Sequence, residues 1–486
     1  TQPYYKVISD NKDYTFKPTI FDDRIYMFHN EYRQQNKKSS FIADFGYTKG
    51  YKSSNSNNRN SMSHLFSKAN IDLDYDNYTN SKIDIFVEKV SMDTYLKIFE
   101  DILITDRSLE DDLKDHNTLT SGIKLTLDNE KFNFTSGITS YENLQKSKND
   151  RYQYVFPYYS LSSTLYSDLN GSVNFSSNGN NTLGETNKLE SKINNNLQYA
   201  SKNKYSKNGF VTNYNIYLKN LNSIGKDSEK YKSSPDLELY NINEISIKYP
   251  LEKILTQTNN FITPKVSFRI NPSDMKDQSS ESRLITTDNI FGINRLGITD
   301  SFESGKSLTF GIDYRKENKK NLDKYFEFKL ATVFRDTPEL DIPKSSSLYN
   351  KSSNLFGSLE NKLSDTLTVD YNFALDNDLQ TFEYNNINTE FNFNNFKTEF
   401  RFQESNGETG DSNFIENETS IQFDENNSLV FSTRRNRKIS LTEFYNFIYE
   451  YQNDCITAAI KYKKTYYSDR DLIPKEDLFF TLTLFP

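Results

Sequence analysis

Apolar and polar residues alternate along this chain in many short stretches. In residues 367–375 every second position is apolar, and Asp370 and Asn372 lie between them. The same period of two recurs in residues 210–218, 245–251 and 308–314. This alternation indicates strands with one apolar and one polar face. Polar turns such as 127–130 and 424–427 separate the runs, as in tight hairpins. The pattern predicts one long antiparallel meander and no clear helix.

The length of the chain indicates which class of fold this meander forms. Single soluble cores stop growing at about 250–300 residues, whereas this chain has 486 residues and no linker or shift in composition. Strands of about 9–11 residues, joined by alternately short and long connections, are typical of membrane-spanning barrels. We therefore predict an all-β fold, a large transmembrane antiparallel β-barrel of about 26 strands. Residues 1–486 are expected to form this single domain.

Hydropathy is compatible with a barrel whose lumen and loops are polar. The mean hydropathy is −0.79, and no stretch reaches the 18 or so apolar residues of a membrane helix. Aromatic residues make up 15% of the chain, which suits interfacial girdles, although Trp is absent. The longer polar connections are predicted to line one rim, at residues 52–66, 100–117, 176–187, 222–236, 271–304 and 336–353.

Charge and motifs give no sign of nucleic-acid binding or catalysis. The net charge is −8, the isoelectric point is about 5.3, and no basic stripe is present. His29, His64 and His116 lack the spacing of metal ligands and are interpreted as isolated surface histidines. No nucleophile elbow, phosphate-binding loop or dinucleotide fingerprint occurs. We expect no enzyme activity, no metal and no cofactor.

The beginning of the chain carries two prolines fifteen positions apart, Pro3 and Pro18. Proline cannot donate to a β-ladder, so it is confined to strand starts, edges and bulges. The two prolines are therefore either ordinary strand-start residues or the mark of a weak seam where the first strand meets the last. No signal peptide precedes this region, so the chain is expected to be mature or a fragment.

Three blocks of sequence resemble the outer-membrane lipopolysaccharide-assembly protein family (LptD). They lie at the start, in the middle and at the end of the chain, so the resemblance extends over the whole barrel. The blocks are Pro3-Tyr4-Tyr5-Lys6-Val7-Ile8-Ser9-Asp10-Asn11-Lys12-Asp13 with Pro18 and Glu31-Tyr32-Arg33; Asn289-Ile290-Phe291-Gly292-Ile293-Asn294-Arg295 through Glu303-Ser304-Gly305 and Leu308-Thr309-Phe310-Gly311; and Tyr466-Tyr467-Ser468-Asp469-Arg470-Asp471-Leu472 with residues 478–486.

The resemblance implies a translocon of the bacterial outer membrane. Pro3 and Pro18 match the two prolines with which the family weakens a lateral gate between its first and last strands. By this resemblance the gate residues are expected to be Pro3, Tyr4, Tyr5, Pro18, Leu482, Thr483, Leu484 and Phe485. The partners it implies are lipopolysaccharide, outer-membrane lipids, a plug lipoprotein in the lumen and a periplasmic bridge to an inner-membrane ATPase.

Two features depart from the family pattern. By this resemblance we expect the family's periplasmic β-jelly-roll domain upstream of the barrel, and we expect this chain to start at the barrel boundary. The family also bridges N-terminal cysteines to an adjacent cysteine pair near the C-terminus, whereas Cys455 is the single cysteine here. The resemblance makes Cys455 a disulfide candidate whose partner would lie upstream of residue 1. The alternative is a buried, inert thiol.

The expected function is insertion of lipopolysaccharide into the outer leaflet through the lateral gate. The alternative is a porin-like or plugged outer-membrane solute transporter, which would have a sealed seam and measurable conductance. A soluble all-β adhesin or carbohydrate-binding protein is a third class, and it would need no detergent.

Overall fold

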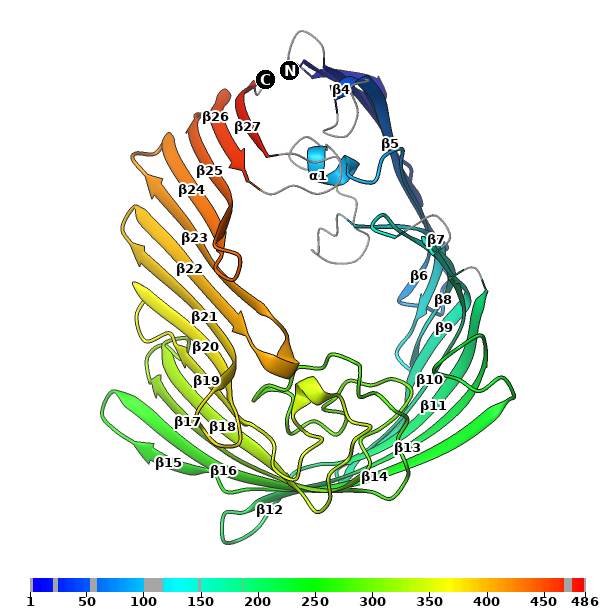
Figure 1. The fold of residues 1–486 in the computed structure, drawn as a ribbon, viewed down its shortest axis with the longest axis vertical. Coiled ribbons are helices and arrows are strands. Elements are labelled where there is room, and N and C mark those ends of the chain that lie inside the picture. Colours follow the sequence, from blue (N-terminus) through cyan, green and yellow to red (C-terminus); the bar gives the residue numbers. More distant parts are fainter. Residues whose placement is uncertain are drawn as a thin grey trace.

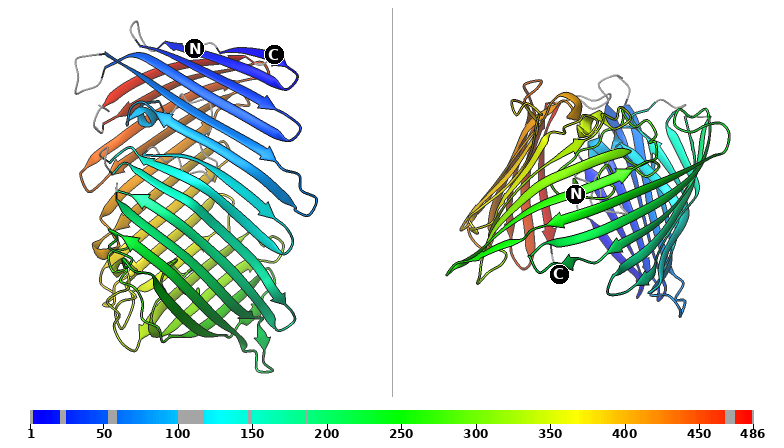
Figure 2. Two further views of the ribbon diagram at one scale, coloured as in Figure 1. Left: turned by 90° about the vertical axis from the view of Figure 1, so that its right-hand side faces the viewer. Right: turned by 90° about the horizontal axis from the view of Figure 1, so that it is seen from below.

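The computed structural model describes residues 3–20, 25–52, 59–99, 117–146, 150–185, 187–466 and 474–484. All of the described strands belong to one sheet of 27 strands. The sheet curls round a central space, so that its first strands and its last strands approach each other (Figure 1). The strands cross the wall obliquely (Figure 2). The predicted all-β barrel architecture is confirmed. No helix among the described residues is long and apolar enough to cross a membrane.

The first part of the wall contains β1 (Tyr4–Ser9), β2 (Lys12–Ile20), β3 (Tyr26–Gln35), β4 (Ser39–Lys52), β5 (Arg59–Asp72), β6 (Asn80–Val90), β7 (Thr118–Asp128), β8 (Phe132–Asn143) and β9 (Tyr152–Ser167). The middle contains β10 (Gly171–Gly184), β11 (Lys188–Ser201), β12 (Lys204–Tyr205), β13 (Val211–Lys226), β14 (Asp236–Lys248), β15 (Leu251–Ile254), β16 (Thr258–Asn271), β17 (Gly305–Asn318) and β18 (Tyr325–Arg335).

The last part contains β19 (Leu355–Asn361), β20 (Leu367–Leu375), β21 (Phe382–Phe393), β22 (Phe396–Ser405), β23 (Ser412–Gln422), β24 (Asn427–Asn436), β25 (Leu441–Gln452), β26 (Ile456–Thr465) and β27 (Lys475–Leu484). The described helical elements are α1 (Tyr95–Phe99), η2 (Lys344–Ser346) and η3 (Gly407–Thr409).

Strands that follow one another in sequence pair in antiparallel ladders with long, regular registers. The ladder of β16 with β17, for example, runs from Thr258 opposite Asn318 to Asn271 opposite Gly305. Strands β12 and β15 are short additions on β13 and β16, because β11 also pairs with β13 and β14 with β16. Without these two, 25 of the 27 strands form the wall.

The two rims of the wall differ, as the sequence predicts. Short turns at 10–11, 36–38, 129–131 and 453–455 form one rim, and the long connections 272–304 and 336–354 lie at the other. The predicted loops 52–66, 176–187 and 222–236 are wrong in part, because they overlap β5, β10 and β13. These segments are rich in Ser and Asn and lack strict alternation. They still pair, because amide side chains hydrogen-bond across strands, as Asn195 does to Asn220 over 3.1 Å.

The wall has its apolar face outside and its polar face inside. On β17 the side chain of Ile312 is 41% exposed, whereas that of Thr309 is 3% exposed. Ile245 and Ile247 on β14 are likewise exposed, and Glu244 and Ser246 beside them are buried. Soluble proteins rarely expose an apolar belt of this extent, whereas a barrel in a bilayer requires one. The structure is therefore a transmembrane β-barrel wall.

The lumen is less polar than the sequence suggests. Helix α1 lies inside the barrel (Figure 1) and contributes Tyr95, Leu96, Ile98 and Phe99 to an apolar cluster on the inner wall. The connections 272–304 and 336–354, here called the plug loops, contribute to a second cluster with β18, β19 and β20. These connections fold inward and bury their own apolar residues. The alternation along the strands does not predict this burial, because the residues lie outside the strands.

Candidate functional site

The first and last strands leave a seam in the wall. Among the described residues, β1 forms a ladder with β2 alone, and β27 forms a ladder with β26 alone. Every residue of β1 is exposed, and the exposed fractions reach 61% at Val7 and, on β27, 74% at Leu478. An unpaired strand edge is costly within a bilayer, where no water satisfies its backbone groups. The seam is thus the weakest line of the wall.

The directions of β1 and β27 explain why these edges do not form an antiparallel ladder. β1 ends at the short turn 10–11, so it runs towards the short-turn rim. β27 ends opposite Ile456, the residue that follows the short turn 453–455, so it runs towards the same rim. Two edges that run in the same direction can pair only in parallel, and parallel pairing is slightly less stable per residue.

The structure places the predicted gate residues along this seam. Pro3 precedes β1, which contains Tyr4 and Tyr5. The ladder of β1 with β2 begins with Tyr4 opposite Phe16, so Pro18 lies two residues beyond the end of that ladder. Both prolines therefore occupy backbone that donates nothing across β1 and β2.

On the other side of the seam, Leu482, Thr483 and Leu484 lie at the end of β27, opposite residues 456–458 of β26. Phe485 lies outside the described residues. The structure brings Pro3, Tyr4, Tyr5 and residues 482–484 to the two edges of the seam, whereas Pro18 lies on the second strand, opposite Phe28 of β3. The role of all these residues as a gate stays a prediction.

Two histidines near the seam are buried, so their interpretation as isolated surface residues is wrong. The rings of His29 and His64 lie 5.2 Å apart on the inner face of β3 and β5. Gly46 of β4 lies between them, and the rings fill the space that a Cβ would occupy. The third histidine, His116, lies outside the described residues. The sequence hides the pair because the two residues belong to different strands.

His64 connects the wall to α1. Its Nε2 lies 3.1 Å from Oδ1 of Asp44, and its Nδ1 lies 2.6 Å from the hydroxyl of Tyr95. Asp44, His64 and Tyr95 are all buried. Helix α1 is thereby held to the strands next to the seam. Among the described residues, no group of three or more His, Cys, Asp or Glu side chains is placed to hold a metal ion.

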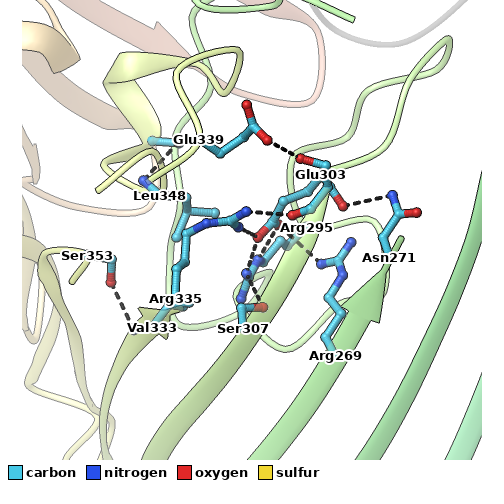
Figure 3. Close-up of polar contacts among 12 residues, drawn as sticks. Arg269, Asn271, Arg295, Glu303, Ser307, Val333, Arg335, Glu339, Leu348 and Ser353 are labelled. Carbon is cyan, nitrogen blue, oxygen red and sulfur yellow. Dashed lines mark hydrogen bonds and ion pairs between the residues drawn. The ribbon is translucent and has the colours of Figure 1, made fainter. Parts of the chain in front are cut away.

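A buried cluster of three arginines and one glutamate holds the first plug loop (Figure 3). Glu303 of this loop accepts hydrogen bonds from Arg269 of β16, Arg295 of the same loop and Arg335 of β18. Arg295 Nε lies 2.7 Å from Glu303 Oε2. Burial opposes ionisation of Glu303, but the surrounding guanidinium groups lower its pKa to about 2. A fully buried carboxylate is stable here because three cations surround it.

Further hydrogen bonds tie this cluster to the wall and to the second plug loop. Arg295 also donates to Thr309 and Ser307 of β17, over 2.9 and 3.0 Å. Ser304 donates to Glu339 of the second plug loop. Arg295, Glu303 and Ser304 all belong to the central block that resembles the lipopolysaccharide-assembly family. Sequence reasoning marked the block but not the cluster, because its cationic partners lie on distant strands.

A second buried anion, Asp300, anchors the same loop to the connection between β13 and β14. Its Oδ2 accepts a hydrogen bond of 2.5 Å from Tyr231 and lies 2.9 Å from Lys230 Nζ. Burial alone would raise the pKa of Asp300, but these contacts and the charge of Lys192 hold that pKa below its ordinary value. The first plug loop is thus fixed by two carboxylates to neighbouring parts of the barrel, to β16 and β18 by Glu303 and to the connection after β13 by Asp300.

Cys455 lies in the exposed short turn between β25 and β26, and it is a free thiol. The alternative of a buried, inert thiol is wrong. The position at the rim leaves the sulfur accessible to a partner thiol, so the disulfide implied by the family resemblance stays a prediction.

Comparisons with known proteins add no assignment. No family model matches the chain, and no curated protein matches it. Among solved structures, the siderophore receptor PirA from Pseudomonas aeruginosa is 9% identical with a TM-score of 0.28, over 98% of this chain and 80% of that chain. The ferric preacinetobactin receptor BauA from Acinetobacter baumannii is 8% identical with a TM-score of 0.26, over 99% and 78%.

The copper transporter OprC is 7% identical, with a TM-score of 0.25, over 98% of this chain and 71% of that chain. At these TM-scores the likeness carries no argument about what this chain does. The assignment that the wall itself supports is a transmembrane barrel with an unpaired seam and a lumen partly filled by its own loops.

Proposed function

We propose that this protein is an outer-membrane translocon that moves lipopolysaccharide sideways, through the seam between β1 and β27, into the outer leaflet. The observation that carries the proposal is the pair of exposed, unpaired edges beside an apolar outer belt. An amphiphile has acyl chains that belong in lipid and sugars that belong in water, so its path must open from lumen to bilayer. A seam without a ladder provides such a path at the lowest cost in hydrogen bonds.

The three blocks that resemble the lipopolysaccharide-assembly family support the choice of cargo. Two of them border the seam, the first in β1 and β2 and the last in β27, and the central block includes the anchored part of the first plug loop. Partners in the same proposal are a plug lipoprotein and a periplasmic bridge that supplies energy. No bond in the cargo changes, so the proposed protein is a transporter and not an enzyme.

The second candidate is a plugged outer-membrane solute transporter. It is favoured by the first plug loop, which Glu303 and Asp300 hold against the inner wall. In such a transporter solutes would pass through the lumen after the plug loops move, and the seam would have no role. The two functions therefore differ in their dependence on the seam.

Locking the seam with a disulfide tests the proposal. In a Cys455→Ser background, Val7→Cys and Tyr5→Cys are each combined with Thr481→Cys, which faces the seam from β27. A matched control joins Thr481→Cys to Ala459→Cys, because these residues lie opposite each other in the existing ladder of β26 and β27. We expect the seam crosslink to stop lipopolysaccharide delivery until it is reduced, and the ladder crosslink to leave delivery unchanged. Normal delivery through a fully crosslinked seam would exclude the lateral path.

A further inference from the structure

Two lysines face each other across the inner side of the seam. Lys17 lies on β2 opposite His29, whose side chain is fully buried on the inner wall. Lys461 lies on β26 opposite Phe479 of β27, next to Ile460, which is exposed on the outer face. Because side chains alternate along a strand, Lys461 points to the lumen. The lysines thus belong to the second strand on either side of the seam.

Lys17 lies five residues after the start of β2 and Lys461 five residues after the start of β26, and both strands start at the short-turn rim, so the two ammonium groups are at the same height on either side of the seam and repel each other. Neither makes an ion pair with a carboxylate among the described residues, and Asp44 attracts Lys17 from beyond ion-pair distance. The imidazole nitrogens of His29, next to Lys17, also have no hydrogen-bond partner in the described part of the chain. Elsewhere in the lumen, cations such as Lys230 and Arg295 contact carboxylates directly. Lys17 and Lys461 thus flank the seam on its inner side without a direct carboxylate contact among the described residues.

We propose that Lys17 and Lys461 bind a phosphate group of an amphiphile between the two edges of the seam. This inference rests on the proposed function and names the part of the cargo that the seam recognises. A phosphate is a strong acceptor for ammonium donors. Without it the two ammonium groups repel each other, whereas with it both are attracted to the same anion. The spacing of the edges would then depend on whether a phosphate is present.

The phosphate has two sources, the cargo and the bilayer phospholipids. A photoreactive benzoylphenylalanine at Thr15, two residues from Lys17 on the same face of β2, reports occupancy by crosslinking. The probes are lipopolysaccharide, its dephosphorylated form and phosphatidylglycerol, each added to the reconstituted full chain. If crosslinking requires the lysines with lipopolysaccharide alone, the cargo is the source of the phosphate. If crosslinking of phosphatidylglycerol requires them as well, the bilayer is a source. Both results support phosphate binding.

We expect the double variant Lys17→Gln/Lys461→Gln to crosslink phosphorylated lipopolysaccharide about tenfold less than the native chain. The variant Lys17→Arg/Lys461→Arg should keep the crosslink, because it keeps both charges. Lys306→Gln/Lys316→Gln on β17, which removes the same charge away from the seam, should have no effect. The dephosphorylated form should crosslink weakly and equally in all variants.

Two results separate the failure of this inference from the failure of the proposed function. Equal crosslinking of phosphorylated lipopolysaccharide to the native and Lys17→Gln/Lys461→Gln proteins would overturn the phosphate site and leave transport standing. A native protein that crosslinks phosphatidylglycerol in a lysine-dependent way, but never lipopolysaccharide, would overturn the cargo and leave the phosphate site standing.

Discussion

At the residue scale, buried charged side chains hold the first plug loop against the inner wall of this barrel. Glu303 is surrounded by Arg269, Arg295 and Arg335, and all four are buried. Removing one partner from a buried ionic cluster leaves the others desolvated and uncompensated. The first plug loop therefore depends on this carboxylate more than on any surface ion pair that it makes.

Replacing Glu303 by Gln should release the first plug loop from the wall. Three guanidinium groups would remain buried without their anion, which typically costs about 3–5 kcal/mol. Hydrogen exchange of residues 294–304 in the folded barrel measures the loss. The control is Glu281→Gln in the same loop, whose exposed pair with Arg283 is worth about 0.2–1 kcal/mol at most.

The same anchor should depend on pH in a defined direction. The pKa of Glu303 is lowered to about 2 from an ordinary 4.5, so the folded loop favours the ionised form. The stabilisation is complete above about pH 4.5 and is lost as the pH falls towards 2. In the Glu303→Gln variant the contribution of Glu303 is absent, so the protection factors of residues 294–304 should fall less over this interval than in the native protein. A loop that stays fully protected in the variant at neutral pH would contradict the role given to Glu303.

The buried residues also mark the limit of what the sequence predicts at this scale. Pro3 and Cys455 are found where a strand pattern places them, at the seam and in a turn, whereas Pro18 lies near the end of β2. The contacts of Glu303, His64 and Asp300 join segments that are distant in sequence, and no local period encodes them. His29 and His64 lack ligand spacing in the sequence, although the ladders of β3, β4 and β5 bring them together.

At the scale of elements, the alternation of apolar and polar residues predicts the strands and their faces. Stretches such as 308–314 and 367–375 lie within β17 and β20, with Phe310 and Ile312 on the outer surface. Strands rich in Asn and Ser were not predicted, because their polar side chains hydrogen-bond to one another across the ladder. Helix α1 and the plug loops were missed as packed elements because their apolar residues bury against the inner wall.

Substitutions that introduce a charge on the outer face should show which residues contact lipid. Ile312→Arg, in the middle of β17, is expected to cost about 2–4 kcal/mol of folding free energy in a bilayer. The matched control is Leu322→Arg, because Leu322 is exposed in the short turn after β17, outside the wall. Folding titrations in phospholipid vesicles measure both variants. Equal stability of the two would mean that the apolar face of β17 does not contact lipid.

At the scale of the whole molecule, the order of strands follows the chain, so its two ends must meet at one seam. Consecutive hairpins leave β1 and β27 as the two edges of a single sheet. Both edges run towards the same rim, and no ladder joins their described residues. The sequence predicts a weak seam from its prolines, but the common direction of the edges follows only from the ladders in the wall.

We expect this seam to widen when cargo passes. Spin labels at Lys6 on β1 and Leu478 on β27, in a Cys455→Ser background, report the distance between the edges by electron–electron resonance. A second pair at Leu218 on β13 and Phe268 on β16 reports the opposite wall, where ladders are continuous. We predict that lipopolysaccharide shifts the seam pair to longer and broader distances and leaves the wall pair unchanged. One narrow distance at the seam, the same with and without lipopolysaccharide, would contradict a lateral gate between β1 and β27.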